Sequence, residues 1–205
     1  KKRHYLNKKS KVLEIASNDG TLLNIIKKKE KCFVLGIDPA KNLSKKSVKK
    51  GIKTISKYFS FQESKRIITK YQKFDYCIAR NVIAHTKNPN DIFKGINNIL
   101  NPRGICVLEV PHLLNIIKQN QYDNIFHEHI GFHSLKSIID LCDRNKLKIL
   151  DVEKIDSQGG SIRCYISKLE YKKKINIKVS KLINMERKKR IFEFYTAKKF
   201  VKKIK

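Results

Sequence analysis

The fold is decided by residues 11–23, which read KVLEIASNDGTLL. This stretch opens with the apolar run of residues 11–15, breaks at the polar turn of residues 16–20, and continues over residues 21–29 with apolar side chains on one helical face. A buried strand, a tight turn and a helix in this order begin a βαβ unit. Ligands of open α/β sheets bind at the carboxyl ends of the strands, so we expect the turn to face a ligand.

The same alternation of short apolar runs with amphipathic stretches continues through the first half of the chain. Each run is almost continuously apolar, as expected for parallel strands covered by helices on both faces. Further strands are predicted at residues 32–37, 52–55, 74–79 and 105–110, and helices at residues 42–50, 61–71 and 91–100. The last of these helices is expected to stop at the segment Asn101-Pro102-Arg103-Gly104.

After Pro111 the rhythm changes. A helix over residues 112–120 is followed by a polar, histidine-rich stretch, and Ser134 is the expected N-cap of a helix over residues 135–145. Two late strands, at residues 148–154 and 161–167, are joined by a loop with Gly159-Gly160 and predict an antiparallel hairpin. The sequence therefore predicts an α/β fold, a Rossmann-like sheet that is mostly parallel and ends in a C-terminal antiparallel hairpin.

Three units are predicted along the chain: a basic tail (1–10), the α/β domain (11–168) and a basic helical extension (169–205). No apolar run approaches the roughly 20 residues needed to cross a bilayer, and no secretory signal opens the sequence. The five cysteines are scattered without a CxxC pair, which favours a reducing cytoplasm. The apolar residues of the extension need a partner surface; they are Ile175, Val179, Leu182, Ile183, Ile191 and Phe194.

The net charge of +29 invites a nucleic-acid interpretation. However, lysine greatly outnumbers arginine and is spread among isoleucine and asparagine, a mixture that an AT-rich coding sequence produces by itself. Aromatic residues interleaved with arginine, which single-strand binders use for base stacking, are not evident in the sequence. Loose attraction to polyanions is expected, but specific nucleic-acid binding is not.

The chemistry of the turn points to a zwitterionic cofactor. Dinucleotides require GxGxxG at this position, whereas Ala16–Gly20 offers one glycine and an acidic Asp19, which disfavours a diphosphate. Glu14 is placed to act on an ammonium group, and Asp38, before Pro39, to accept hydrogen bonds from two ribose hydroxyls. The alternatives are a plain helix-capping turn and, for Asp38, a simple helix start.

Six blocks of the sequence together resemble the sugar C-methyltransferases, which methylate carbon 3 of nucleotide-linked deoxysugars. The blocks run in order over residues 11–166: LEIASNDGTLL (13–23), GIDPA (36–40), NVIAH (81–85), EVPHLL (109–114), HEH (127–129) and GGSIR (159–163). Generic methyltransferases share the first two blocks only. The later blocks carry the resemblance to the sugar enzymes.

The resemblance implies a class I methyltransferase domain that binds S-adenosyl-L-methionine and a nucleotide-linked keto sugar. It also implies that an N-terminal zinc module and part of a C-terminal lobe are lacking from this stretch. The cofactor-binding positions it implies are Glu14, Ala16, Ser17, Asn18, Asp19, Gly20, Asp38, Pro39 and Asn81.

Carbon methylation needs a carbanion-like nucleophile, and hence a base beside a ketone. By resemblance, His129 is the general base, Glu128 its acidic companion and His85 a stabiliser of the enolate oxygen. Phe126 stands where the family usually has tyrosine, and Arg80 where it commonly has asparagine. The implied substrate contacts are Phe126, His127, Ser161 and Arg163.

Simpler explanations compete with these roles. The His127–His129 stretch could bind a metal, although further ligands at suitable spacing are missing from the sequence, and we expect no metal. His85, His112 and His133 could be structural, and the segment around Ser161 and Arg163 could be a hairpin turn. The competing functions are a methyltransferase acting on another small molecule or a glycan, and a non-catalytic remnant that binds the cofactor.

Overall fold

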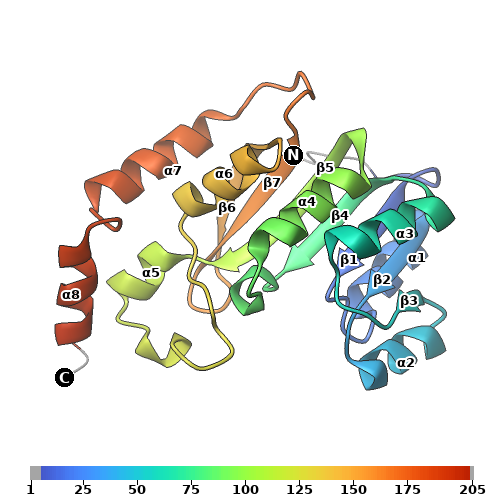
Figure 1. Ribbon diagram of the computed structural model, residues 1–205, viewed down its shortest axis with the longest axis horizontal. Helices are drawn as coiled ribbons and strands as arrows, with labels where there is room; N and C mark the ends of the chain where they lie inside the picture. Colours follow the sequence, from blue (N-terminus) through green and yellow to red (C-terminus); the bar gives the residue numbers. More distant parts are fainter. Residues whose placement is uncertain (1–5, 204–205) are drawn as a thin grey trace.

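The structure is a computed structural model that describes residues 6–203. Residues 1–5 of the predicted N-terminal tail and residues 204–205 of the extension lie outside the described part. The described chain forms one seven-stranded sheet with helices packed on both faces (Figure 1). Among the described helices, none is long and apolar enough to span a membrane.

The sheet has the strand order β3-β2-β1-β4-β5-β7-β6. Strands β1 to β5 pair in parallel, and β7 inserts antiparallel between β5 and β6. This confirms the predicted mostly parallel sheet with a C-terminal antiparallel hairpin. The strands are β1 (Lys11–Ile15), β2 (Phe33–Ile37), β3 (Lys53–Ile55), β4 (Phe74–Arg80), β5 (Leu100–Pro111), β6 (Leu147–Ile155) and β7 (Ser161–Lys168).

The helices divide between the two faces of the sheet. The larger apolar core joins the sheet to side chains of α3, α4, α6 and α7, and a smaller cluster joins α1 to β1 and β2 on the other face (Figure 1). The helices are α1 (Thr21–Glu30), α2 (Lys41–Lys49), α3 (Phe61–Tyr71), α4 (Pro89–Ile99), α5 (Leu113–Lys118), α6 (Leu135–Arg144), α7 (Ile177–Lys188) and α8 (Phe194–Lys202), with short 3-10 turns η1 (Ile83–His85) and η2 (Tyr122–Asn124).

The segment that was expected to end the helix over residues 91–100 is part of a strand instead. Residues 101–104 belong to β5, and Leu100 already pairs with Phe74. A register shift between Phe74 and Tyr76 accommodates Pro102 in this irregular start, because a bulge tolerates a residue without a backbone N–H. Gly104 fits because a Cβ there would approach the Phe74 carbonyl oxygen to 2.9 Å.

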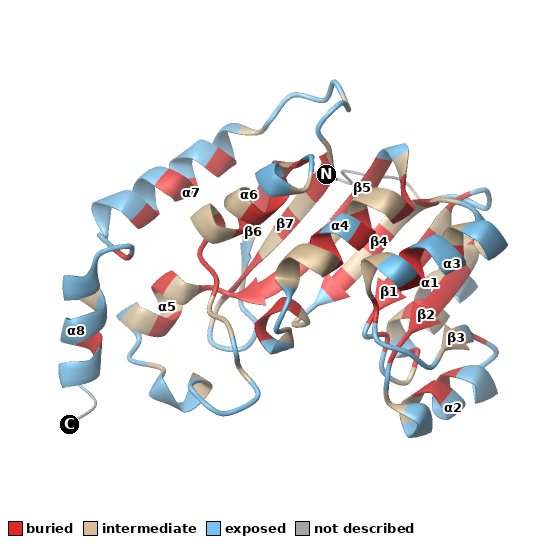
Figure 2. Ribbon diagram, in the orientation of Figure 1, coloured by how far each residue is buried: buried red, intermediate tan, exposed pale blue. Residues whose placement is uncertain are grey.

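The C-terminal extension contains two helices with different environments. Along α7, Val179, Leu182 and Ile183 are buried and join the main core, so this helix has its partner surface (Figure 2). The expectation that Ile175 and Phe194 would also be covered is wrong: both are exposed, Phe194 by 82%. Phe194 begins α8, which is mostly exposed and buries Phe200 as its single buried residue. All five cysteines are buried and free, as small apolar side chains.

Candidate active site

The turn Ala16–Gly20 leaves β1 in an unusual backbone conformation. Ala16 and Asn18 both have φ 53°, and Gly20 has φ 73°, so three residues of the turn are left-handed. The Ser17 N–H donates to the Ile37 carbonyl at the end of β2, which holds the turn over the carboxyl ends of two neighbouring strands. Left-handed residues other than glycine are uncommon and cluster at functional sites, because the surrounding structure must hold them.

Two glycines allow this turn to pack closely. A Cβ at Gly20, which is also left-handed, would collide with the Ser47 hydroxyl of α2. A Cβ at Gly36 in β2 would collide with the Ser17 hydroxyl. These two positions explain why glycine occurs in both sequence blocks, since each permits an approach that a side chain would prevent.

Asp38 follows β2 and braces the turn. Its Oδ2 atom accepts a hydrogen bond of 2.8 Å from the Asn18 N–H, and its Oδ1 atom one of 2.9 Å from the Ala40 N–H. An ionised carboxylate has about four acceptor positions, so each oxygen keeps capacity for one more donor. The buried Asp38 side chain is therefore preorganised to accept two hydroxyl groups at the carboxyl ends of β1 and β2.

Glu14, in β1, is almost completely buried beside this turn. Its Oε1 accepts from the Arg80 guanidinium at 2.9 Å, and its Oε2 has no partner among the described residues. Burial raises the pKa of Glu14 to about 7, although Arg80 opposes the shift; the charges of Asp19 and Asp38 raise the pKa further. A cationic ligand beside Oε2 would relieve this unfavourable burial.

A cavity of about 540 Å³ opens next to the turn. Its volume falls in the range of small-molecule sites. Ala16, Pro39, Asn81 and His85 line it together with aromatic and aliphatic side chains that include Tyr58 and Phe59. Two buried polar atoms of this region, the Ser17 hydroxyl and the Asn81 Oδ1, have no partner within residues 6–203. Such orphaned atoms mark places where a ligand can complete the hydrogen bonding.

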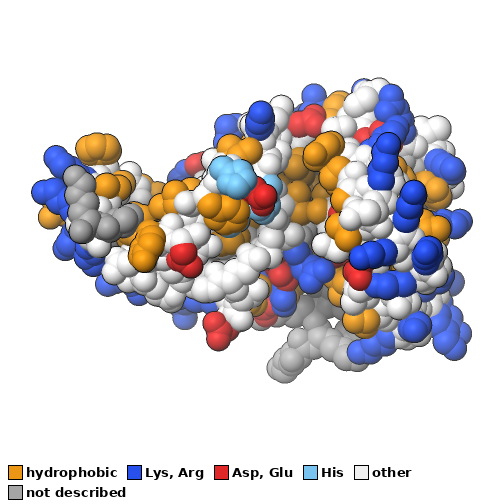
Figure 3. Space-filling view, turned by 90° about the horizontal axis from the view of Figure 1, so that it is seen from below, with side chains coloured by type: hydrophobic (Ala, Val, Ile, Leu, Met, Phe, Trp, Pro, Cys, Tyr) orange, Lys and Arg blue, Asp and Glu red, His pale blue; other side chains and the backbone are white. Residues whose placement is uncertain are grey.

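Two predicted catalytic histidines lie side by side, and one of them, His85, lines this cavity. The ring centroids of His85 and His129 lie 4.8 Å apart, and the Phe126 ring lies 4.2 Å from the His129 ring. The His85 Nδ1 is 3.0 Å from the Glu128 carbonyl oxygen, and the His129 Nδ1 is 2.8 Å from the Asn124 carbonyl oxygen. Figure 3 shows histidines beside a hollow with hydrophobic side chains at its base.

These contacts determine which ring nitrogen carries a proton. A carbonyl oxygen can only accept, so the Nδ1 of each histidine must be the donor. In the neutral imidazole the other nitrogen, Nε2, is then unprotonated and basic. His129 is therefore held in the tautomer that a general base requires, and His85 can donate from Nε2 only as an imidazolium.

The two ends of the histidine loop, residues 113–132, lie next to each other. His112 and His133 form an isolated parallel bridge, and the Leu113 N–H donates to the His133 carbonyl at 2.9 Å. Further along, the N–H groups of Ile130 and Gly131 both donate to the Ala84 carbonyl. The loop is thus pinned to η1, which places His129 next to His85.

Glu186 of α7 binds residues next to both ends of the histidine loop. Its buried carboxylate accepts from His112 Nε2 at 2.8 Å and from the Leu135 and Lys136 N–H groups at 2.6 and 3.1 Å. These two N–H groups open α6, where the helix dipole also favours an anion. The extension is therefore a structural part of the site, and this contact supports the structural alternative for His112.

Other predicted site residues interact with partners outside the pair His85 and His129. The His127 side chain is 89% exposed, and its Nε2 lies 3.8 Å from the Glu128 carboxylate, which is also exposed. Asp19 pairs with Lys50, and the Ser161 hydroxyl donates to the Ser157 carbonyl within its own turn. Arg163 donates to Glu109 at 2.6 Å across β5 and β7. The structure thus groups His85, Phe126 and His129, and leaves these side chains outside that cluster.

Several residues of the site could not be found from the sequence. Tyr58, Phe59 and Lys87 line the cavity without belonging to any recognisable motif. Glu186 lies 74 residues beyond its partner His112, so no spacing signal connects them. In the described part of the chain, no group of three or more His, Cys, Asp or Glu side chains is placed to hold a metal ion.

Comparison with known proteins shows which proteins the chain is similar to. A sequence model described as "Methyltransferase domain" matches residues 2–152. C-methyltransferase NovU of Streptomyces niveus is 31% identical over 176 residues, covering 86% of this chain and 42% of the relative. The chain therefore spans less than half the length of this curated relative.

Solved structures share the fold at low sequence identity. Magnesium protoporphyrin IX methyltransferase of Synechocystis PCC 6803, solved with bound SAH, superposes with a TM-score of 0.59 at 12% identity, over 80% of this chain and 75% of that one. Cyclopropane synthase MmaA2 of Mycobacterium tuberculosis gives a TM-score of 0.56 at 12% identity, over 73% of this chain and 58% of that one.

Proposed function

The chain belongs to the methyltransferase-domain family, and we propose that it methylates a carbon atom beside the ketone of a nucleotide-linked keto-deoxysugar. Its cofactor is S-adenosylmethionine. The observation that carries the proposal is His129, whose Nδ1 is bound to a carbonyl so that Nε2 can act on a substrate, beside His85, which lines the same cavity as Ala16 of the turn. The buried free cysteines suit work in the reducing cytoplasm.

The residues around the turn fit this cofactor. The unpartnered Oε2 of Glu14 can accept from the ammonium group, and Asp38 retains acceptor positions for both ribose hydroxyls. The orphaned Ser17 hydroxyl and Asn81 amide oxygen supply further hydrogen bonds. Ala16, Asn18, Asp19, Gly20 and Pro39 complete the proposed cofactor site. When bound, the cofactor supplies a methyl group on a sulfonium, which reacts with nucleophiles.

Carbon becomes nucleophilic only after it loses a proton. We assign this step to His129: its Nε2 takes the proton from the carbon next to the ketone, and the electron pair moves onto the ketone oxygen as an enolate. His85, as an imidazolium, donates from Nε2 to that oxygen. Glu128 orients His85 through its main-chain carbonyl, and its exposed carboxylate is available to the sugar.

The substrate assignment rests on the resemblance of the histidine block and on the name of the relative, a C-methyltransferase. The proposed sugar contacts are Phe126, His127, Ser161 and Arg163. Of these, Phe126 already lies against the His129 ring and would stack on the acceptor. Ser161 and Arg163 require a rearrangement of their present partners before they can contact a substrate.

Phe126 also favours an alternative, a methyltransferase for a different small molecule or a glycan. The phenyl ring keeps the shape of the tyrosine it replaces but lacks its hydroxyl, and a site that loses one hydrogen bond selects substrates differently. A third candidate is a cofactor-binding remnant without catalysis.

Proton exchange tests the proposal directly. Incubating the protein with a dTDP-4-keto-deoxysugar in D₂O, without cofactor, should replace the proton next to the ketone by deuterium, observed by NMR. His129→Ala should abolish this exchange. An absence of exchange in the wild type, together with methyl transfer to another acceptor, would select the alternative.

Cofactor binding is tested separately by calorimetry. Wild-type protein should bind S-adenosylmethionine, and Asp38→Ala should weaken binding by about tenfold to a hundredfold, because charged hydrogen bonds contribute about 1.5–3 kcal/mol. Binding without any exchange or methyl transfer would support the remnant. No binding in the wild type would overturn all three candidates.

A further inference from the structure

A second cavity, of about 720 Å³, lies at the opposite edge of the sheet from the cofactor turn. Lys73 precedes β4 and Lys168 ends β7, which is antiparallel, so both lie at the amino ends of the parallel strands. The end of α6 and one side of α4 supply the other walls. This cavity is far along the strands from the histidines and belongs to no part of the proposed reaction.

The lining of this cavity is cationic. Of its ten lining residues, five are basic and none is acidic, whereas the whole chain has 47 basic residues among 205. Four of the other five are asparagines, whose amide groups are hydrogen-bond donors, although Asn145 already uses its amide within the protein. The basic residues are Lys73, Lys94, Arg144, Lys146 and Lys168.

These cations have no counter-charge in direct contact. Within residues 6–203, none of the five forms an ion pair with an acidic side chain. Two acidic side chains of this region have other or weaker interactions: the Asp140 carboxylate pairs with Lys136, and Glu170 acts on Lys168 only at longer range. Burial, and next the ammonium of Lys73, lower the pKa of Lys168. A protein that holds two half-buried ammonium groups side by side gains stability when an anion binds between them.

The walls of the cavity are preorganised. The Asn145 amide donates to Asn90 Oδ1 at 3.2 Å and so joins α6 to α4 across the cavity. Arg144 is held by a bond from its Nε to the Asp140 carbonyl, which leaves its terminal nitrogens available. Lys94 lies over the Phe61 ring at 4.4 Å from the centroid, so that ring is already covered by a cation.

From this arrangement we propose that the amino-edge cavity binds a small multivalent anion that carries phosphate groups. Its volume suits a small ligand, and its cations surround a hollow from several segments, whereas a nucleic-acid backbone is bound along an extended stripe. The covered Phe61 ring disfavours stacking of a base, so the phosphates themselves are the recognised groups.

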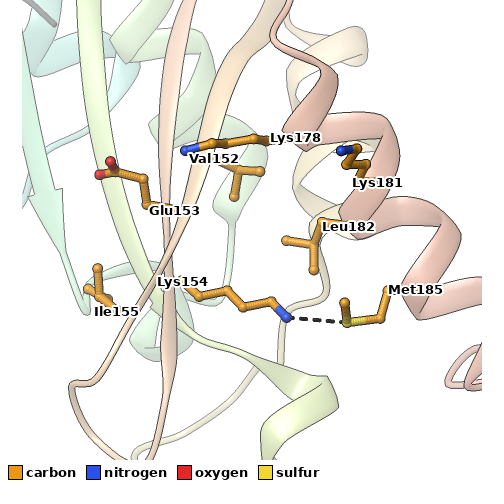
Figure 4. Close-up of a pocket in the computed structure, with 8 residues that line it drawn as sticks. All are labelled: Val152, Glu153, Lys154, Ile155, Lys178, Lys181, Leu182 and Met185. Carbon is orange, nitrogen blue, oxygen red and sulfur yellow. Dashed lines mark hydrogen bonds between the residues drawn. The ribbon is translucent and has the colours of Figure 1, made fainter. Parts of the chain in front are cut away.

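A second lysine-lined groove provides a matched control. It lies between β6 and α7 and includes Lys154, Lys178 and Lys181, but Glu153 also lines it (Figure 4). Lys154 contacts the Met185 sulfur at 3.2 Å, and much of the remaining lining is apolar. Removing two lysines here changes the net charge of the protein as much as removing two from the amino-edge cavity.

Titration calorimetry with inorganic triphosphate, at about 150 mM salt to suppress loose attraction, tests the proposal. Wild-type protein should bind one equivalent, and the Lys73→Gln/Lys168→Gln variant should bind at least about tenfold more weakly. The control variant Lys154→Gln/Lys181→Gln should bind within about twofold of wild type. Thermal melts should show that triphosphate raises the Tm of the wild type and control more than that of the cavity variant.

The outcomes separate the possibilities. Equal weakening in both variants would show that the attraction is general, and the proposal would fall. It would equally fall if a short single-stranded RNA bound more tightly than triphosphate and lost affinity in the cavity variant, because the ligand would then be a nucleic acid. Binding of S-adenosylmethionine should be unchanged in both variants, so the proposed function stands or fails separately.

Discussion

The cofactor turn and the histidine loop meet at one cavity but are constructed in different ways. The turn Ala16–Gly20 joins consecutive elements, and the Ser17 hydroxyl and the neighbouring Glu14 Oε2 are buried and lack partners in the described part of the chain. The histidine loop, residues 113–132, presents more exposed side chains, and its position depends on contacts from η1, from the turn before β7 and from α7. The turn is held mainly by the neighbouring β1, β2 and α2, whereas the histidine loop is held by elements that lie further apart in the sequence.

This difference teaches where each half is vulnerable. A strand, a turn and a helix fix the cofactor side, so its function depends on a few buried carboxylates and on backbone conformation. The histidine side depends on being held in place, because its rings are oriented by main-chain carbonyls. Substitutions can therefore separate binding of the cofactor from chemistry on the acceptor. They can also show whether a change in the histidine loop leaves the cofactor turn unaffected.

The largest expected effect is on catalysis. His129→Ala should lower methyl transfer by about 10²–10⁴-fold, the usual contribution of a general base, while cofactor affinity stays within about twofold. Rates are measured with radiolabelled cofactor, and affinity by calorimetry. The matched control is Tyr122→Ala, an exposed residue of the same loop outside the proposed site, which should keep most of the activity. Equal losses in both variants would show that the loop acts as a whole and that His129 has no special role.

The second effect is on the attachment of the loop. Glu186→Ala leaves His112 and the start of α6 without their buried hydrogen-bond acceptor, and each buried donor left unsatisfied costs about 1–3 kcal/mol. Urea denaturation should show this loss of unfolding free energy. Hydrogen exchange should show loss of protection in residues 113–132 before residues 11–30.

Glu193→Ala is the control for that experiment. This glutamate pairs with Arg190 on the exposed surface, and its removal should leave the denaturation curve unchanged. Uniform loss of protection over the whole chain in Glu186→Ala would contradict the independence of the two halves, since the cofactor side would then rely on the same contact.

A smaller effect concerns the cofactor side and depends on pH. Because the folded protein raises the pKa of Glu14 from 4.5 to about 7, the folded state binds this proton more tightly than the unfolded state. The resulting stabilisation is complete below about pH 4.5 and is lost as the pH rises to about 7, by about 3 kcal/mol in all. Glu14→Gln should remove this dependence.

The measurement is the unfolding free energy of wild type and Glu14→Gln between pH 5 and pH 8, without cofactor. The wild type should lose stability relative to the variant over this range, and the difference should level off above about pH 7. Parallel curves would mean that Arg80 neutralises Glu14 fully and that no unfavourable burial remains for a cationic ligand to relieve.

The cofactor half was predictable for a physical reason. Buried parallel strands are continuously apolar, so β1, β2 and β4 and the placement of Asp38 follow from local patterns. The hairpin was also visible, because Gly159-Gly160 separates two short apolar runs. The boundary at residues 101–104 was not, since proline and glycine signal a break unless a bulge absorbs them.

The histidine half was recognisable as a motif but not as a structure. No periodicity tells that Glu186 contacts His112, or that Arg80 pairs with Glu14, because such contacts depend on how distant elements pack. The same limit explains Phe194: an apolar residue on a helix predicts a partner surface, yet α8 projects from the fold with this side chain exposed. The roles of the individual site residues remain predictions.

The bridge between His112 and His133 has a consequence for how such an enzyme can diversify. Because the loop leaves and returns at one point, its contents can be lengthened or exchanged while the two anchor positions stay fixed. Doubling the length of a closed loop costs only about 0.6 kcal/mol in chain entropy, so a graft here is tolerable. A new acceptor specificity could therefore be acquired by replacing one continuous cassette of the gene, with the methyl-donor half inherited unchanged.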